Sequence, residues 1–217
     1  MSITVFLADD HRMVREGFRL LLESEVDIKV IGEAGTGTET VRLVTKLTPD
    51  VVLMDIAMPE MNGVEVTHQV CKSCPSTKVI ILSMYSNSLH ISRAFKAGAQ
   101  GYILKESAGE DVIKAVRTVH GGRIFLCNKI ADVVVDKYIK GGVTDQGRDP
   151  LAELSARERQ ILQLLVEGNS NSRVAEILFL SMKTVETYRS HLMQKLGITD
   201  LPALVRFAIR HGLTPLE

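Results

Sequence analysis

The chain has 217 residues, enough for one large domain or two small ones with a buried core. It is 45% hydrophobic and 24% charged, which is typical of an ordinary soluble protein. No apolar run approaches the roughly 18 residues of a membrane span, and the N-terminus lacks the pattern of a secretory signal, so we expect a cytoplasmic protein with no membrane partner. Lys and Arg together number 26, as do Asp and Glu, so composition alone gives no support for nucleic-acid binding.

Short apolar runs alternate with amphipathic stretches through residues 1–121. The runs are short enough to be strands and lie at residues 3–8, 28–33, 51–55, 79–82 and 102–104. Apolar side chains at helical spacing follow each run, as at Val14, Phe18 and Leu21 after the first. This repetition predicts an α/β fold with a doubly wound, five-stranded parallel sheet. The first, third and fourth runs are wholly apolar and should be central, which predicts the flavodoxin-like strand order 2-1-3-4-5.

Polar residues follow four of these predicted strands. They are Asp9 and Asp10 after the first, Asp55 at the end of the third, Ser83 at the end of the fourth and Lys105 after the fifth. In open α/β sheets, ligands bind outside the carboxyl ends of the strands where the winding reverses, here between strands one and three. Taken singly, an Asp there is more often a turn cap, and a Ser or Lys is more often an ordinary surface residue. Together they indicate a site.

Three carboxylates at one sheet edge repel one another unless a cation lies between them. Oxygen ligands at this density suit Mg²⁺, which binds one or two carboxylates and leaves positions for phosphate oxygens. A carboxylate such as Asp55 beside Mg²⁺ can attack a phosphoryl group and form an aspartyl phosphate. Lys105 would then stabilise charge on the transferring oxygens, and Ser83 could donate a hydrogen bond to one of them.

These residues resemble the receiver domain of two-component response regulators. The resemblance covers residues 3–121 and includes Met58-Pro59 and Asn62-Gly63 after Asp55. In one departure, Glu106 follows Lys105, where many receivers have proline.

The resemblance implies a role for each residue of the cluster. Asp55 would be the phosphoacceptor (4-aspartylphosphate), assisted by Lys105 and Ser83. Ser83 would also form, with Tyr102, the switch pair whose reorientation reports phosphorylation. Mg²⁺ would be bound by Asp10, Asp55 and the backbone carbonyl of Ala57, with Asp9 acting through water.

Beyond this region the pattern predicts a helix at 130–139 and then a Gly-rich flexible linker at 141–149. A capping box, Ser155-Ala156-Arg157-Glu158, then opens a segment whose periodicity predicts four helices and no strand. We therefore predict three parts: an α/β domain at 1–122, a linker with one helix at 123–150, and an all-α domain at 151–217.

The third helix of the all-α domain has an apolar face and a polar face. The polar face carries Lys183, Glu186, Thr187, Ser190 and Gln194. It could enter a major groove, with Thr184, Arg189 and Lys195 touching phosphates at its edges. Periodicity alone favours a solvated helix face. Residues 151–217 carry eight Lys or Arg and seven Asp or Glu, so charge gives little affinity and two copies should pair on DNA.

This domain resembles the LuxR-type helix-turn-helix at Val174-Ala175, Thr184-Val185 and Lys195-Leu196-Gly197, and at Leu154-Ser155 before them. With the receiver, the whole chain is similar to the NarL/FixJ class of response regulators. Two of the expected DNA-binding residues depart from that pattern, since Glu186 replaces a usual lysine and Tyr188 a frequent histidine. Glu186 cannot bind phosphate but can accept from cytosine N4, so we hypothesise that it helps to set base preference.

The resemblance implies a transcription factor and not an enzyme. A sensor histidine kinase would phosphorylate Asp55, and a homodimer formed through the helix at 200–210 would bind paired half-sites of operator DNA, with RNA polymerase as a further candidate partner. Two alternatives remain. A Mg²⁺-dependent phosphohydrolase would need a further acid or base near Asp55, which the sequence lacks, and a constitutive DNA binder would not need the intact acidic cluster.

Cys71 and Cys74 form a single CxxC motif, and His68 precedes them at the same interval. Without a second pair to complete a zinc site, free and partly buried thiols are favoured over a metal or redox site.

Overall fold

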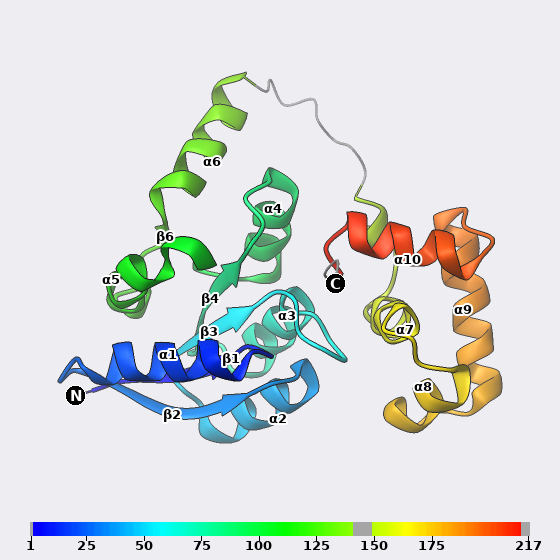
Figure 1. Ribbon diagram of the computed structural model, residues 1–217, viewed down its shortest axis with the longest axis horizontal. Coiled ribbons are helices and arrows are strands. Elements are labelled where there is room, and N and C mark those ends of the chain that lie inside the picture. The colour runs from blue at the N-terminus through cyan, green and yellow to red at the C-terminus, as the bar shows by residue number, and fades with distance from the viewer. Residues whose placement is uncertain (1, 141–148, 214–217) are drawn as a thin grey trace. The chain divides into compact units, whose positions relative to one another are not determined.

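The computed structural model describes residues 2–140 and 149–213. Its contacts group the chain into two compact units, one built around the sheet and one made of the C-terminal helices. Figure 1 shows the helices and strands of both units.

The first unit contains a parallel sheet with the order β2-β1-β3-β4-β5-β6. Its strands are β1 (Ile3–Ala8), β2 (Ile28–Ala34), β3 (Val51–Asp55), β4 (Lys78–Ser83), β5 (Gly101–Leu104) and β6 (Phe125–Leu126). The predicted fold class and the order of the first five strands are confirmed. The sequence analysis missed β6, because two residues are too few to show a strand pattern. The backbone nevertheless pairs, since the Phe125 N–H donates to the Gln100 carbonyl at 3.0 Å.

Helices cover both faces of this sheet. They are α1 (Arg12–Glu23), α2 (Gly37–Leu47), α3 (Gly63–Ser73), α4 (Ser88–Ala97) and α5 (Ala108–His120). α2, α3 and α4 pack in a row, and α1 packs against α5. Every residue of β3 is buried as a result. An unbroken apolar run is therefore favoured in this strand, because neither face meets water.

The last helix of this unit is α6 (Asn128–Lys140), close to the helix predicted at 130–139. It packs against α4 and β5. The segment at 123–140, predicted as part of a linker, thus adds a strand and a helix to the first unit. Of the flexible linker predicted at 141–149, all but the last residue lies outside the described residues.

The second unit is helical throughout its described residues. After a short 3₁₀ turn, η2 (Pro150–Glu153), it contains α7 (Ala156–Val166), α8 (Asn171–Leu178), α9 (Met182–Leu196) and α10 (Leu201–Arg210). The predicted capping box is present, because the Glu158 N–H donates to the Ser155 hydroxyl and the Ser155 N–H donates to the Glu158 carboxylate. One apolar cluster joins the four helices through fully buried side chains, including Leu162, Val174, Val185, Leu192 and Leu204.

None of the helices in the described part of the chain is both long and apolar enough to cross a membrane.

Gly63, the first residue of α3, lies against the end of β3. Its N–H donates to the Ile56 carbonyl at 2.8 Å. A Cβ built at this position would overlap the carbonyl oxygen of Asp55 and would lie 3.1 Å from the Ile56 Cα. The start of α3 can therefore approach the strand only because this residue has no side chain.

We expect Gly63→Ala to lower the free energy of unfolding by about 1–3 kcal/mol or more, because backbone atoms must move to admit the methyl group. The matched control is Gly109→Ala in α5, where a Cβ meets nothing within 4 Å. That substitution should instead add about 0.5–1 kcal/mol through helix propensity. Urea denaturation measures both, and equal effects would contradict the role of close backbone approach.

Candidate functional site

The ends of four neighbouring strands bring the predicted site residues together. Ala8 of β1 pairs with Met54 of β3. Asp9 follows Ala8 and Asp55 follows Met54, so the two carboxylates lie side by side at the ends of these strands. In β4 and β5, Ser83 pairs with Leu104, and Lys105 follows. Parallel register therefore places the two carboxylates, the hydroxyl and the ammonium group at one edge of the sheet.

Lys105 joins the two buried carboxylates. Its Nζ lies 2.7 Å from Asp9 Oδ2 and 2.9 Å from Asp55 Oδ2. Asp9 and Asp55 are only 2% and 3% exposed, so water screens these ion pairs weakly. The single cation thus compensates two negative charges that would otherwise repel one another.

This compensation is incomplete, as the pKa of Asp55 shows. Burial and the nearby charge of Asp9 raise the pKa of Asp55 to about 6, although Lys105 and the Ala57 N–H act in the opposite direction. Burial also opposes the charge on Lys105, but the attraction of Asp55 and Asp9 outweighs it and raises the pKa of that ammonium group. Two buried carboxylates thus share one ammonium group.

A cation can bind beside these residues. Ligand atoms of Asp9, Asp10, His11 and Asp55 all lie within 4.8 Å of one another. Asp10 is the most exposed of the three carboxylates, and its Oδ1 lies 2.6 Å from His11 Nδ1. The His11 N–H donates to Asp9 Oδ1 at 2.9 Å. Three carboxylates are hard oxygen donors, and this donor set fits Mg²⁺.

Ser83 and Tyr102 are linked through the backbone after β4. The Tyr85 N–H donates to the Ser83 hydroxyl at 2.9 Å, and the Tyr102 hydroxyl donates to the Tyr85 carbonyl at 2.7 Å. Burial raises the pKa of Tyr102 to about 12, against a hydrogen bond with Ser83 that lowers it. The structure thus brings the two predicted switch residues together through Tyr85.

The sequence analysis missed Tyr85 and His90. The two rings stack with centroids 4.6 Å apart, and His90 is buried in α4. Their only sequence signal is that Tyr85 follows Ser83 by two residues, which does not reveal a ring contact with the next helix.

The expected DNA-binding residues lie on α9, with differing exposure. The exposed ones are Lys183, Glu186, Thr187, Ser190, Gln194 and Lys195, while Thr184, Tyr188 and Arg189 are partly buried. Tyr188 packs against the apolar cluster of the domain. α9 begins at Ser181, whose hydroxyl accepts from the Thr184 N–H at 3.1 Å.

Lys195 is already paired within the domain. Its Nζ lies 2.7 Å from Glu158 Oε2, whose side chain is 5% exposed. Burial raises the pKa of Glu158, but hydrogen bonds from Lys195 and Ser155 outweigh it, so the pKa is lowered overall. Lys195 thus ties the end of α9 to the start of α7.

The three cysteines are free thiols. Cys71 donates to the Gly98 carbonyl at 3.5 Å, and burial raises the pKa of its thiol.

The peptide bond between Lys105 and Glu106, where many receivers have proline, is trans. No cis peptide bond occurs among the described residues.

Both units match described protein families. Residues 5–117 match the response regulator receiver domain, and residues 152–208 match the luxR family of bacterial regulatory proteins. The chain therefore belongs to the response regulators that join a receiver domain to a LuxR-type DNA-binding domain, as the sequence resemblance predicted.

Two curated proteins are similar to the chain over nearly its whole length. The chain is 38% identical to the oxygen regulatory protein NreC of Staphylococcus epidermidis over 213 residues, which cover 96% of this chain and 98% of that protein. It is also 38% identical to NreC of Staphylococcus carnosus over 212 residues, with the same coverage.

Two solved structures are similar in fold. One is a LuxR-family two-component response regulator from Aurantimonas sp. SI85-9A1, with a TM-score of 0.62 and 32% identity over 64% of this chain and 99% of that chain. The other is RcsB from Salmonella enterica serovar Typhimurium, bound to promoter P1flhDC in the presence of phosphomimetic BeF3-. Its TM-score is 0.61, with 26% identity over 95% of this chain and 98% of that chain.

Asp55→Asn should stabilise the receiver above about pH 6 in Mg²⁺-free buffer. The folded state keeps the Asp55 proton at pH values where the unfolded chain, with a pKa of 3.8, has lost it, so stability falls as pH rises from about 4 to about 6. A shift of roughly two pKa units corresponds to about 3 kcal/mol, which asparagine should restore. Urea denaturation across this pH range should show the wild type and the variant converging below about pH 4.

The control with the opposite sign is Asp50→Asn. Burial opposes the charge on Asp50, but hydrogen bonds from the Thr4 N–H and hydroxyl, at 2.8 and 2.6 Å, lower its pKa overall. Removing that charge should cost stability at neutral pH. A neutral or destabilising Asp55→Asn at pH 8 would show that burial and Asp9 do not disfavour the charged carboxylate.

Proposed function

We propose that the chain is a transcription regulator switched by phosphorylation of Asp55 by a partner histidine kinase. The observation that carries this proposal is the buried Asp55 carboxylate, which contacts Lys105 at 2.9 Å beside the acidic cluster. A nucleophile, a cation for the transferred oxygens and a set of metal ligands meet at one sheet edge. The architecture of a receiver joined to a DNA-binding domain gives the modification an output.

Mg²⁺ would be held by Asp10, Asp55 and the backbone carbonyl of Ala57, and by Asp9 through water. When bound, the ion supplies positive charge that neutralises the carboxylates and the incoming phosphate oxygens. This charge would offset the repulsion by Asp9, which adds to burial in raising the pKa of Asp55.

In the proposed transfer, a carboxylate oxygen of Asp55 attacks the phosphorus of a phosphohistidine. The new O–P bond forms as the P–N bond breaks, and the histidine nitrogen of the kinase leaves with the electron pair. Lys105 exchanges its contact with Asp55 for the transferred oxygens, while its contact with Asp9 keeps the ammonium group in place. The burial of Asp55 limits access of water to the product.

The effect of phosphorylation would pass from Asp55 to the rest of the receiver through Ser83. If its hydroxyl turns to donate to a phosphoryl oxygen, the hydrogen bond from the Tyr85 N–H is altered, and the Tyr85 carbonyl that accepts from Tyr102 moves with it. Phosphorylation would shift the equilibrium between states with which the phosphoryl group interacts differently, and this contact would distinguish them.

The output we propose is binding of operator DNA by a homodimer. The exposed polar face of α9 would enter the major groove, Thr184, Arg189 and Lys195 would contact phosphates, and α10 would join the two copies. RNA polymerase is the candidate partner for activation at a promoter. RcsB, with 26% identity, is described in complex with DNA.

We expect a small phosphodonor such as acetyl phosphate, with Mg²⁺, to add one phosphoryl group to Asp55. The adduct should be stable in acid and labile in base, as an acyl phosphate is, and mass spectrometry of peptides should place it. Asp55→Asn should remove it, and Lys105→Met should slow its formation by about 10²–10³-fold, since transition-state charge loses its cation. Asp50→Asn, outside the site, should react like the wild type.

Labelling at another residue would contradict this assignment. Continuous release of phosphate from a phosphomonoester would identify a phosphohydrolase instead. Operator affinity that is equal for wild type and Asp55→Asn, with and without the phosphodonor, would identify a constitutive DNA binder.

Glu186→Lys should change the ranking of operator sequences selected from a fragment library. Loss of a bidentate or base-edge contact typically costs about 1–3 kcal/mol of discrimination at one position. The control, Arg189→Ala at a predicted phosphate contact, should weaken all sequences alike and reduce the salt dependence of binding by about one unit of slope. An unchanged ranking with Glu186→Lys would remove Glu186 from base recognition.

A further inference from the structure

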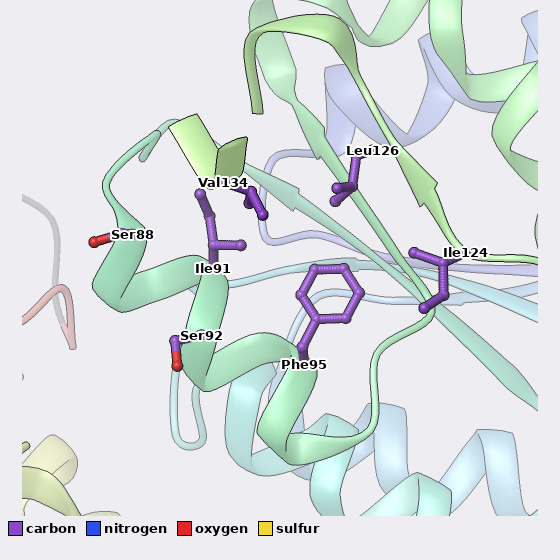
Figure 2. Close-up of a pocket in the computed structure, with 7 residues that line it drawn as sticks. All are labelled: Ser88, Ile91, Ser92, Phe95, Ile124, Leu126 and Val134. Atoms are coloured by element: carbon purple, nitrogen blue, oxygen red, sulfur yellow. The ribbon is translucent and has the colours of Figure 1, made fainter. Parts of the chain in front are cut away.

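An apolar pocket lies between α4, β6 and α6, on the side of β5 away from β4 (Figure 2). Its volume is about 420 Å³. Its lining consists of Ser88, Ile91, Ser92 and Phe95 from α4, Ile124 and Leu126 at β6, and Val134 from α6. None of these residues takes part in the acidic cluster, the switch pair or the polar face of α9.

The lining defines what the pocket can hold. Five of its seven side chains are apolar and none is charged. Figure 2 shows the Ile91, Phe95 and Leu126 side chains converging on the cavity, while the hydroxyls of Ser88 and Ser92 point away from them. A charged ligand would lose its hydration here without gaining a partner, whereas an apolar ligand would be favoured by burial.

Parts of this lining are costly to leave in water. Ile124 is 66% exposed and Val134 is 38% exposed.

The volume of the pocket indicates the size of its ligand. A cavity of this volume falls in the range of small-molecule sites, about 300–1,000 Å³. The cavity itself is lined by seven residues, which suits a small molecule better than a protein interface of about 1,000 Å² or more.

We propose that this pocket binds a small, uncharged, mainly apolar molecule. The ligand would pack between Phe95 and Ile91 of α4 and the side chains of Ile124, Leu126 and Val134. Its occupancy would hold α4 against α6. Because α4 also carries His90, whose ring stacks on Tyr85, the ligand would act on the same helix that borders the switch pair.

The chain contains no tryptophan, which provides a direct test. Val134→Trp places an indole on the wall of the pocket, and Val135→Trp places one on the next residue of α6, which is 52% exposed and does not line the cavity. The first indole should fill the pocket and emit at shorter wavelength, and the second should emit as in water.

The binding probe is N-phenyl-1-naphthylamine, a neutral apolar dye that fluoresces when it leaves water. The full chain should bind it saturably, with one dye per chain. Val134→Trp should weaken binding by about tenfold or more, equivalent to about 1.4 kcal/mol, and Val135→Trp should leave it unchanged. Ile124→Glu, at an exposed position of the lining, is a second variant that adds charge without filling a buried site, and it should also weaken binding.

Three results would overturn the proposal. The first is no saturable binding by the wild type. The second is equal binding by Val134→Trp, Ile124→Glu and Val135→Trp when circular dichroism shows each variant to be folded. The third is dye binding that appears only with dimer formation in light scattering, which would assign the pocket to a second copy of the chain.

Discussion

The receiver depends on one electrostatic arrangement, in which the Lys105 ammonium group contacts both Asp9 and Asp55. Asp9 follows β1, Asp55 is the last residue of β3, and Lys105 follows β5, so the contact joins the carboxyl ends of three strands. A buried carboxylate without a partner would be costly, and two of them side by side would be more so. The single lysine lowers this cost but leaves the pKa of Asp55 raised to about 6. The charge that remains is negative, and it would favour binding of a divalent cation.

Much of this arrangement could be read from the chain. Apolar runs such as residues 51–54 are unbroken because both faces of the strand are covered, and their ends identify the polar residues at one sheet edge. The positions of Asp9, Asp55 and Lys105 follow from parallel register alone. The sixth strand could not be predicted, since pairing of Phe125 and Leu126 is decided by the backbone of β5 and not by their own pattern.

Contacts between elements were harder to predict than the elements themselves. The stacking of Tyr85 on His90 joins a loop to a helix face, and no spacing in the sequence encodes the orientation of two rings. The same holds for the pocket between α4 and α6, whose lining comes from residues 88–95 and from residues 124–134, about 30 positions further along the chain. Periodicity identifies which side chains leave water, but packing between elements decides which of them meet.

The ion pair between Lys195 and Glu158 joins the end of α9 to the capping box of α7. Lys195 contacts the same Glu158 oxygen that accepts from the Ser155 N–H, so its replacement would remove one contact of the capping box whether or not it touches DNA. Glu186 and Gln194, on the polar face of the same helix, are exposed. In the proposed mode of DNA binding, Lys195 would therefore serve both the fold and the DNA contact, whereas Glu186 and Gln194 would serve mainly DNA recognition.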